Sequence, residues 1–136
     1  MASGQNIISE IILTKTAEVF LIDGPILVIK FIDNGFEADL DEITLQIAAG
    51  KKLTDNKKAP VLVDVRESFH SLTKAAQDMA AKEENKLAEA ILVEAFHQRL
   101  IGTFFLKLSH QKNKHPVKMF TDEAEAINWL KQFISK

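Results

Sequence analysis

The sequence contains no cysteine and no tyrosine, and it has only three prolines and five glycines in 136 residues. Without cysteine the chain can form neither disulfides nor thiolate metal sites, and no thiol can act as a catalytic nucleophile. Its longest runs of large apolar residues, such as Val19–Ile22 and Ile26–Ile29, are four residues long. Because a membrane-spanning helix needs about 20 apolar residues, we expect no transmembrane segment.

Charge and composition narrow the class of protein further. Seventeen basic and nineteen acidic side chains give a formal net charge of −2, which argues against a chain held to nucleic acid by its overall charge. Hydrophobic residues make up 46% and charged residues 26% of the chain, as in soluble globular domains. The length suits one domain over residues 1–136, with residues 1–6 a candidate for disorder. These first residues lack the features of a secretory signal, which predicts a cytoplasmic protein.

The first third of the chain has the composition of β-strands. Ile7–Leu13, Ala17–Ile22 and Ile26–Ile32 are rich in apolar and β-branched residues, and Asp23-Gly24-Pro25 is typical of a turn. Both arms of the resulting hairpin are apolar at nearly every position, which indicates a sheet covered on both faces. If one arm is an edge strand, a second copy of the chain should cover it, which predicts a homodimer.

After the hairpin, the apolar residues recur with the period of a helix. We expect this helix to begin at Leu40, with Asp39 and Glu42 as a capping box, and to end at Gly50. The lysine-rich segment Lys51–Lys58 is then a surface connection. Three strand–helix units follow, with strands at Val61–Val65, Glu89–Glu94 and Val117–Phe120 and helices at about Leu72–Glu84, Phe96–Ser109 and Glu123–Ile134.

This alternation predicts the fold class. Strands and helices at such spacing form parallel strands joined by right-handed crossovers. Within the third helix, Thr103–Leu106 alone also fits a strand, but a parallel crossover favours the helix. The second helix should pack closely on the sheet, because its expected inner face is made of Leu72, Ala75, Ala76, Met79 and Ala80. We therefore predict an α/β fold with an N-terminal antiparallel hairpin, a mainly parallel sheet and about four helices.

Two arginines, Arg66 and Arg99, are expected at one edge of this sheet. The loops that lead from strand to helix all lie at the carboxyl ends of the parallel strands, where ligands of α/β proteins usually bind. The two guanidinium groups could clamp an anion there. Alternatively they pair with nearby Asp64, Glu67 or Glu94 and brace the loops, which is the favoured interpretation because such ion pairs are common.

Hydroxyl side chains in the first of these loops also have two interpretations. Ser68, Ser71 and Thr73 lie where a strand leads into a helix. Ser71 would serve well as the helix N-cap, which is the commonest use of a hydroxyl at this position. Alternatively, Ser71 or Thr73 is a phosphoacceptor whose added charge changes a partner surface.

The remaining candidates are a histidine and a glycine. His97 lies close to Arg99 and could carry a proton, although a neutral surface histidine is the more common case. The four histidines of the chain match no metal-ligand pattern, so we expect neither a metal nor another cofactor. Gly102 costs stability inside a helix and could mark the wall of an apolar pocket beside Phe104 and Phe105, although ordinary core packing is favoured.

Three sequence blocks carry a resemblance to a known family. They are Val61–Arg66, Arg99–Phe105 and Met119–Glu123, the last followed by Trp129-Leu130. In their order among the predicted elements, from roughly Val19 to Phe133, they resemble STAS/CRAL-TRIO-like bacterial proteins. These are small cytoplasmic relatives of the anti-sigma factor antagonists and are mostly uncharacterised.

The resemblance implies two kinds of binding. Signalling members bind a kinase-like protein partner and are switched by phosphorylation of a serine in an Asp-Ser-Ser-Gly-like turn. The matching region, Ser68–Ala75, has Ser71 and Thr73 but neither the acidic residue nor the glycine. Members of the lipid-carrying branch hold their ligand in an apolar cavity.

Together these features predict a non-enzymatic binding or regulatory module. The chain has no nucleophile elbow, phosphate-binding glycine loop or dinucleotide fingerprint. We expect it to recognise a protein partner through the strand-to-helix loop edge, or alternatively to carry a small apolar or anionic, lipid-like ligand. The candidate binding residues are Asp64, Arg66, Ser68, Ser71, Thr73, His97, Arg99 and Gly102.

Overall fold

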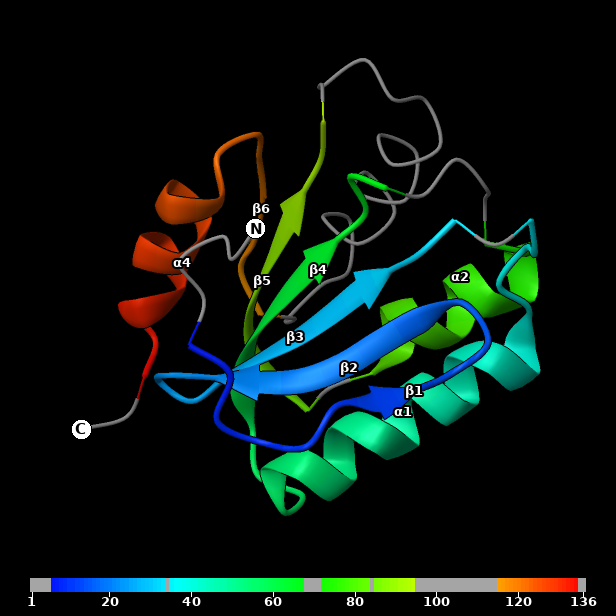
Figure 1. Cartoon of the computed structure of the whole chain (residues 1–136), viewed down its shortest axis with the longest axis horizontal. Coiled ribbons are helices and arrows are strands. Elements are labelled where there is room, and N and C mark those ends of the chain that lie inside the picture. The colour runs from blue at the N-terminus through cyan, green and yellow to red at the C-terminus, as the bar shows by residue number, and fades with distance from the viewer. Residues whose placement is uncertain (1–5, 34, 68–71, 84, 95–114, 135–136) are drawn as a thin grey trace.

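The computed structural model describes residues 6–33, 35–67, 72–83, 85–94 and 115–134 (Figure 1). Its centre is a six-stranded sheet in the order β1-β2-β3-β4-β5-β6. The strands are β1 (Ile12–Leu13), β2 (Ala17–Ile22), β3 (Ile26–Phe31), β4 (Ala59–Asp64), β5 (Lys86–Leu92) and β6 (Val117–Phe120). The first three strands pair antiparallel, and β3 to β6 pair parallel. The predicted antiparallel hairpin and parallel sheet are thus confirmed.

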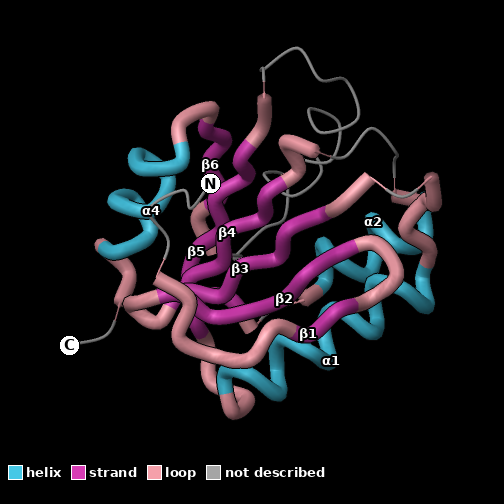
Figure 2. Tube along the Cα trace, viewed as in Figure 1, coloured by secondary structure: helices cyan, strands magenta, loops and turns pink. Residues whose placement is uncertain are grey.

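Three helices cover the sheet within the part of the chain that the structure describes. They are α1 (Leu40–Thr54), α2 (Lys74–Lys82) and α4 (Glu123–Lys131). Helices α1 and α2 lie on one face of the sheet and α4 lies on the other (Figures 1 and 2). The helix predicted at Phe96–Ser109 lies outside the described residues.

Alternate residues of each central strand enter two separate apolar layers. Val61 and Ile91 pack under α1 and α2, whereas Leu62 and Leu92 pack under α4 with Leu130. Because both faces of these strands are buried, apolar residues are needed at nearly every position. This arrangement is the physical reason for the uninterrupted apolar runs in the sequence.

The homodimer prediction loses its structural basis. Neither arm of the hairpin, β2 or β3, is an edge strand, because β1 pairs with β2 and β4 pairs with β3. The edge is formed by β1, which is only two residues long. The prediction of a strand over Ile7–Leu13 was therefore wrong in its length, although Ile7 does make an isolated bridge to Ile22. A homodimer stays a prediction without this support.

Helix α1 continues through Gly50, where the sequence predicted its end. The helix reaches Thr54 and is terminated by Asp55, whose φ of 56° is left-handed. Gly50 is buried within the helix. A Cβ atom at this position would lie 2.8 Å from Cδ2 of Leu27, so the helix backbone lies close to this side chain. Close approach to the sheet, rather than a left-handed turn, therefore explains this glycine. Lys51 and Lys52 consequently belong to the last turn of α1 and not to a connecting loop.

Helix α2 begins later than predicted. Its N-cap is Thr73, whose side chain accepts a hydrogen bond from the backbone N–H of Ala76 at 3.1 Å. The sequence predicted Ser71 as this cap, and Ser71 lies outside the described residues. Thr73 has the capping role that was predicted for Ser71. Of the expected inner face, Ala75 and Met79 are exposed, whereas Ala76 and the unpredicted Ala81 are buried.

Glu42 ties the start of α1 to the turn between β1 and β2. The predicted capping box is only half formed: Asp39 accepts the backbone N–H of Glu42 at 2.9 Å. The Glu42 carboxylate instead accepts hydrogen bonds from Thr14, Thr16 and Gln46. Burial raises the pKa of Glu42, but these hydrogen bonds outweigh it and hold the pKa below its usual value.

Candidate functional site

Arg66 lies at the predicted strand-to-helix edge and joins two carboxylates. Its Nε and Nη2 atoms donate to Asp64 Oδ1 and Oδ2 at 3.0 and 2.8 Å, and Nη2 also donates to Glu123 Oε1 at 2.8 Å. Asp64 ends β4 and Glu123 begins α4, so the arginine connects the sheet to the helix that covers it. The favoured interpretation, that Arg66 pairs with Asp64 and braces the loop, agrees with these contacts.

Arg66 and its two carboxylate partners, Asp64 and Glu123, together carry more negative than positive charge. The hydrogen bond with Asp64 is the largest cause that raises the pKa of Arg66 further above its ordinary value, so the guanidinium stays charged. One arginine faces two buried carboxylates, and Glu123 Oε2 is buried with no hydrogen-bond partner among the residues that the structure describes. An anion clamp needs an uncompensated positive charge, and Arg66 does not supply one.

The structure brings together only part of the predicted site. Asp64 and Arg66 are in contact, and Thr73 caps α2 nearby in the sequence. Ser68, Ser71, His97, Arg99 and Gly102 lie outside the described residues, as do Phe104 and Phe105. Their predicted roles, including phosphorylation at Ser71 or Thr73, stay predictions.

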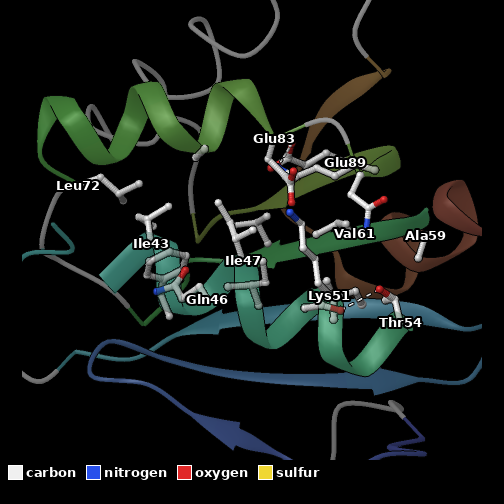
Figure 3. Close-up of a pocket in the computed structure, with 18 residues that line it drawn as sticks. Ile43, Gln46, Ile47, Lys51, Thr54, Ala59, Val61, Leu72, Glu83 and Glu89 are labelled. Carbon is white, nitrogen blue, oxygen red and sulfur yellow. Dashed lines mark hydrogen bonds and ion pairs between the residues drawn. The ribbon is translucent and has the colours of Figure 1, made fainter. Parts of the chain in front are cut away.

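A cavity that sequence reasoning did not locate lies between α1, α2 and the sheet. Its volume, on the scale used for protein cavities, is about 60 Å³, and its mouth is open to solvent. Most of its wall is apolar, and Figure 3 shows Ile43, Ile47 and Leu72 on the inner sides of this space. The strands contribute Leu27, Ile29, Phe31, Ala59, Val61, Val63, Lys86 and Glu89. Mostly apolar walls with a few polar groups are typical of sites for small molecules.

The charged side chains that Figure 3 labels gather at one end of the cavity, whereas the uncharged Gln46 lies near Ile43. Lys51, Glu83 and Glu89 lie at this end, away from Leu72 and Ile43 (Figure 3). Here α1 ends, α2 ends and β5 begins. The chain therefore places charged residues from three elements beside one apolar space.

Glu89 is the most buried charged group of this end, with 1% of its surface exposed. Its Oε1 atom is 3.0 Å from Lys86 Nζ and 3.0 Å from His115 Nε2. Burial raises the pKa of Glu89, but the charge of Lys86 and the hydrogen bond with His115 outweigh it, so the pKa lies below its ordinary value. The carboxylate is thus held in its charged form inside the core.

The second oxygen of Glu89, Oε2, differs from the first in its contacts. Oε2 is buried and has no hydrogen-bond partner in the described part of the chain. Buried polar atoms are nearly always hydrogen-bonded, and an exception needs an explanation. Because Glu89 also lines the cavity, this oxygen is the chemically distinctive atom of the site.

Sequence reasoning missed this cluster for identifiable reasons. The strand was expected to begin at Glu89, where an acidic residue would be exposed, but β5 begins at Lys86 and places Glu89 within the strand. His115 is one of the four histidines that match no metal-ligand pattern, and no other role was predicted for it. The available signal was an acidic residue in an otherwise apolar segment, Leu87–Val93, since a charge in a buried strand requires partners.

The described residues contain neither a metal-binding cluster nor a membrane-spanning helix. No group of three or more His, Cys, Asp or Glu side chains there is placed to hold a metal ion. No helix in the same residues has the length and apolar character needed to span a membrane.

Comparison with known proteins identifies the fold. A family described as Domain of unknown function (DUF7793) matches residues 20–134 of the chain. No curated protein is significantly similar in sequence. The chain is similar to the crystal structure of an uncharacterized DUF3478-family protein with a SpoIIAA-like fold from Shewanella loihica PV-4. The TM-score is 0.57 and the sequence identity is 18%, over 96% of this chain and 98% of that chain. This similarity shows a SpoIIAA-like, that is STAS-like, α/β fold, as the sequence predicted.

Proposed function

Since the chain belongs to the family described as Domain of unknown function (DUF7793), we propose a function from the geometry of the described residues. The protein is a non-enzymatic binding module that takes a small, largely apolar ligand into the cavity between α1, α2 and the sheet. The observation that carries this proposal is the apolar cavity itself, and Glu89, whose Oε2 atom is buried without a partner among the described residues, is one of the residues that line it. A cytoplasmic location belongs to the same proposal.

The position of the cavity supports this function. It lies between two helices and three strands, which supply most of its wall, and Leu72, Glu83 and Asn85 from the connections complete it. Gly50 lets α1 approach Leu27 closely at one side, while Ala80 keeps the facing side of α2 small. The small side chain of Ala80 leaves space in the cavity that a larger one would fill.

Binding of toluene, which is apolar and has no hydrogen-bonding group, tests this proposal. We expect toluene to shift the amide NMR signals of cavity residues such as Ile47 and Val61. Ala80→Phe places a ring in the cavity and should abolish these shifts. Ala75→Phe is the matched control, because Ala75 is exposed on the same helix. No toluene-dependent shifts, or equal shifts in Ala80→Phe, would overturn the proposal.

A second candidate function is recognition of a protein partner through the strand-to-helix loop edge. Two features favour it: Glu123 Oε2 has no partner among the described residues, and the Arg66 side chain is partly exposed. A protein partner could donate a hydrogen bond to Glu123 Oε2 and contact Arg66. This edge is also where ligands of α/β sheets usually bind.

Partner capture with surface variants tests the second candidate. Glu67→Lys changes an exposed side chain at this edge, and Arg99→Ala removes the other arginine predicted there. Lys131→Ala, at the exposed end of α4, is the control. Loss of a partner with the first two variants and retention with the control supports this function, whereas equal capture by all forms counts against it.

A further inference from the structure

We infer that the cavity binds an amphiphile whose polar head donates a hydrogen bond to Glu89 Oε2, and that it disfavours a carboxylate head. The class of ligand is a short alkyl or aryl compound with an ammonium or hydroxyl group. This inference rests on the proposed ligand-binding function and adds the chemistry of the head group.

The hydrogen bonds of Glu89 are distributed unequally between its two oxygens. Oε1 is 3.0 Å from both Lys86 Nζ and His115 Nε2, whereas Oε2 has no partner among the described residues. An ionised carboxylate oxygen accepts hydrogen bonds and cannot donate them. Only a donor can therefore satisfy Oε2.

The two ends of the cavity match the two ends of an amphiphile. The apolar end, with Ile43 and Leu72, offers no charged group, and the opposite end holds Lys51, Glu83 and Glu89 (Figure 3). An apolar body at the first end would bring a head group to the second. A purely apolar ligand would leave Oε2 unsatisfied.

The charges at the polar end decide between a donor and an anionic head. The Lys86 side chain is 9% exposed and already engages Oε1 of Glu89, so its charge is compensated. A ligand carboxylate placed at Oε2 would meet another carboxylate at short range, which is unfavourable in a buried site. At Glu89 Oε2, the lipid-like anion considered from the sequence is therefore the less suitable ligand, even though the exposed Lys51 also lies at this end of the cavity.

A matched series of ligands tests the inference on the wild-type protein. Hexylamine, hexanol and hexanoate share one alkyl chain and differ only in the head. We expect hexylamine, hexanol or both to bind about tenfold or more tightly than hexanoate, because hydrogen bonds to a charged acceptor are strong. Tight binding of hexylamine identifies an ammonium group as a suitable donor, and tight binding of hexanol identifies a hydroxyl group as one. Equal or tighter binding of hexanoate overturns the inference.

Glu89→Gln provides a second test. If the glutamine oxygen keeps the contact with Lys86, its NH₂ group takes the place of Oε2 and becomes a donor. The preference should then reverse: hexylamine weakens about tenfold, hexanoate gains, and hexanol, which can also accept, changes little. Glu125→Gln, at an exposed site on α4, should leave the series unchanged. An unchanged series in a folded Glu89→Gln variant overturns the inference, and the wild-type series decides if that variant does not fold.

The toluene experiment separates this inference from the proposed function. If toluene binds but the three head groups bind alike, the cavity is a ligand site and only the head-group assignment fails. If toluene also fails to bind, the proposed function fails as well.

Discussion

Glu89 of β5 is the register partner of Val61 of β4, so a buried carboxylate lies beside a buried apolar side chain in the middle of the parallel sheet. Val61 is in turn the partner of Leu27, and Glu89 is the partner of Val117. Three apolar side chains therefore share one row across the four parallel strands with a single charged one. The partners of that charge come from Lys86 and His115 and not from this row.

This relationship predicts a large loss of stability when the Glu89 charge alone is removed. Glu89→Leu leaves the Lys86 ammonium group in a nearly buried position without its partner, which should lower the free energy of unfolding by about 3–5 kcal/mol. Glu89→Leu combined with Lys86→Met removes both charges and should recover most of this loss. Urea unfolding of the three forms measures the difference. A single variant as stable as the wild type would show that the ion pair has no such role.

The Glu42 network predicts loss of stability at acid pH. The ordinary carboxyl value is 4.5, and the pKa of Glu42 in the folded protein lies below it. Between these values the unfolded chain binds more protons, so the free energy of unfolding should decrease as the pH falls below about 4.5. Glu89 contributes with the same sign.

Glu42→Gln separates this contribution from the others. The variant should lose about 1–3 kcal/mol near neutral pH, because an NH₂ group replaces an acceptor that faces donors from Thr14 and Thr16. It should also show a shallower decrease of stability in acid, since glutamine does not titrate. Unfolding by urea across the pH range measures both effects, and an acid decrease identical to that of wild type would contradict this role.

Gly50 should tolerate a side chain poorly. Gly50→Val adds atoms where even a Cβ would lie 2.8 Å from Cδ2 of Leu27, and such overpacking costs about 1–3 kcal/mol. Ala48→Val, at an exposed position on the same helix, should cost only the difference in helix propensity, which is less than about 1 kcal/mol. Thermal unfolding of both variants compares them, and equal losses would mean that α1 can move away from the sheet.

Arg66 should contribute strongly to stability whatever its role in binding. Arg66→Ala leaves Asp64 and Glu123, which are 2% and 8% exposed, without a cation, at a cost of about 3–5 kcal/mol. Lys30→Ala removes an ion pair with the exposed Glu67 and should change stability by less than about 1 kcal/mol. If calorimetry finds the two variants equally stable, the Arg66 bridge is not a structural contact.

Thr73 is expected to act as a helix cap. Thr73→Ala removes the acceptor for the Ala76 N–H and should cost about 1 kcal/mol. Thr44→Ala, within the exposed surface of α1, should instead be neutral or slightly stabilising, because alanine has the higher helix propensity. The same sign of change in both variants would argue against the cap.

The local patterns of the sequence were sufficient for the order and direction of the strands. The limits of β2 and β6 were predicted to the residue, because turn residues and a cap border them. Errors occurred where contact with another element overrides a local signal. Gly50 has the sequence appearance of a helix end, and only Leu27 on the neighbouring strand shows that it is a point of close approach.

The sequence by itself determined the α/β class, the hairpin and the burial of both sheet faces, because hydrophobic periodicity and turn chemistry act between near neighbours in the chain. Tertiary structure alone decided which charges meet. Arg66 reaches Glu123 across 57 positions, and Glu89 meets His115 across 26. Such contacts depend on strand register and on how helices dock, which fix distances in space that residue spacing does not contain. The cavity and its unpaired carboxylate oxygen exist only at that level.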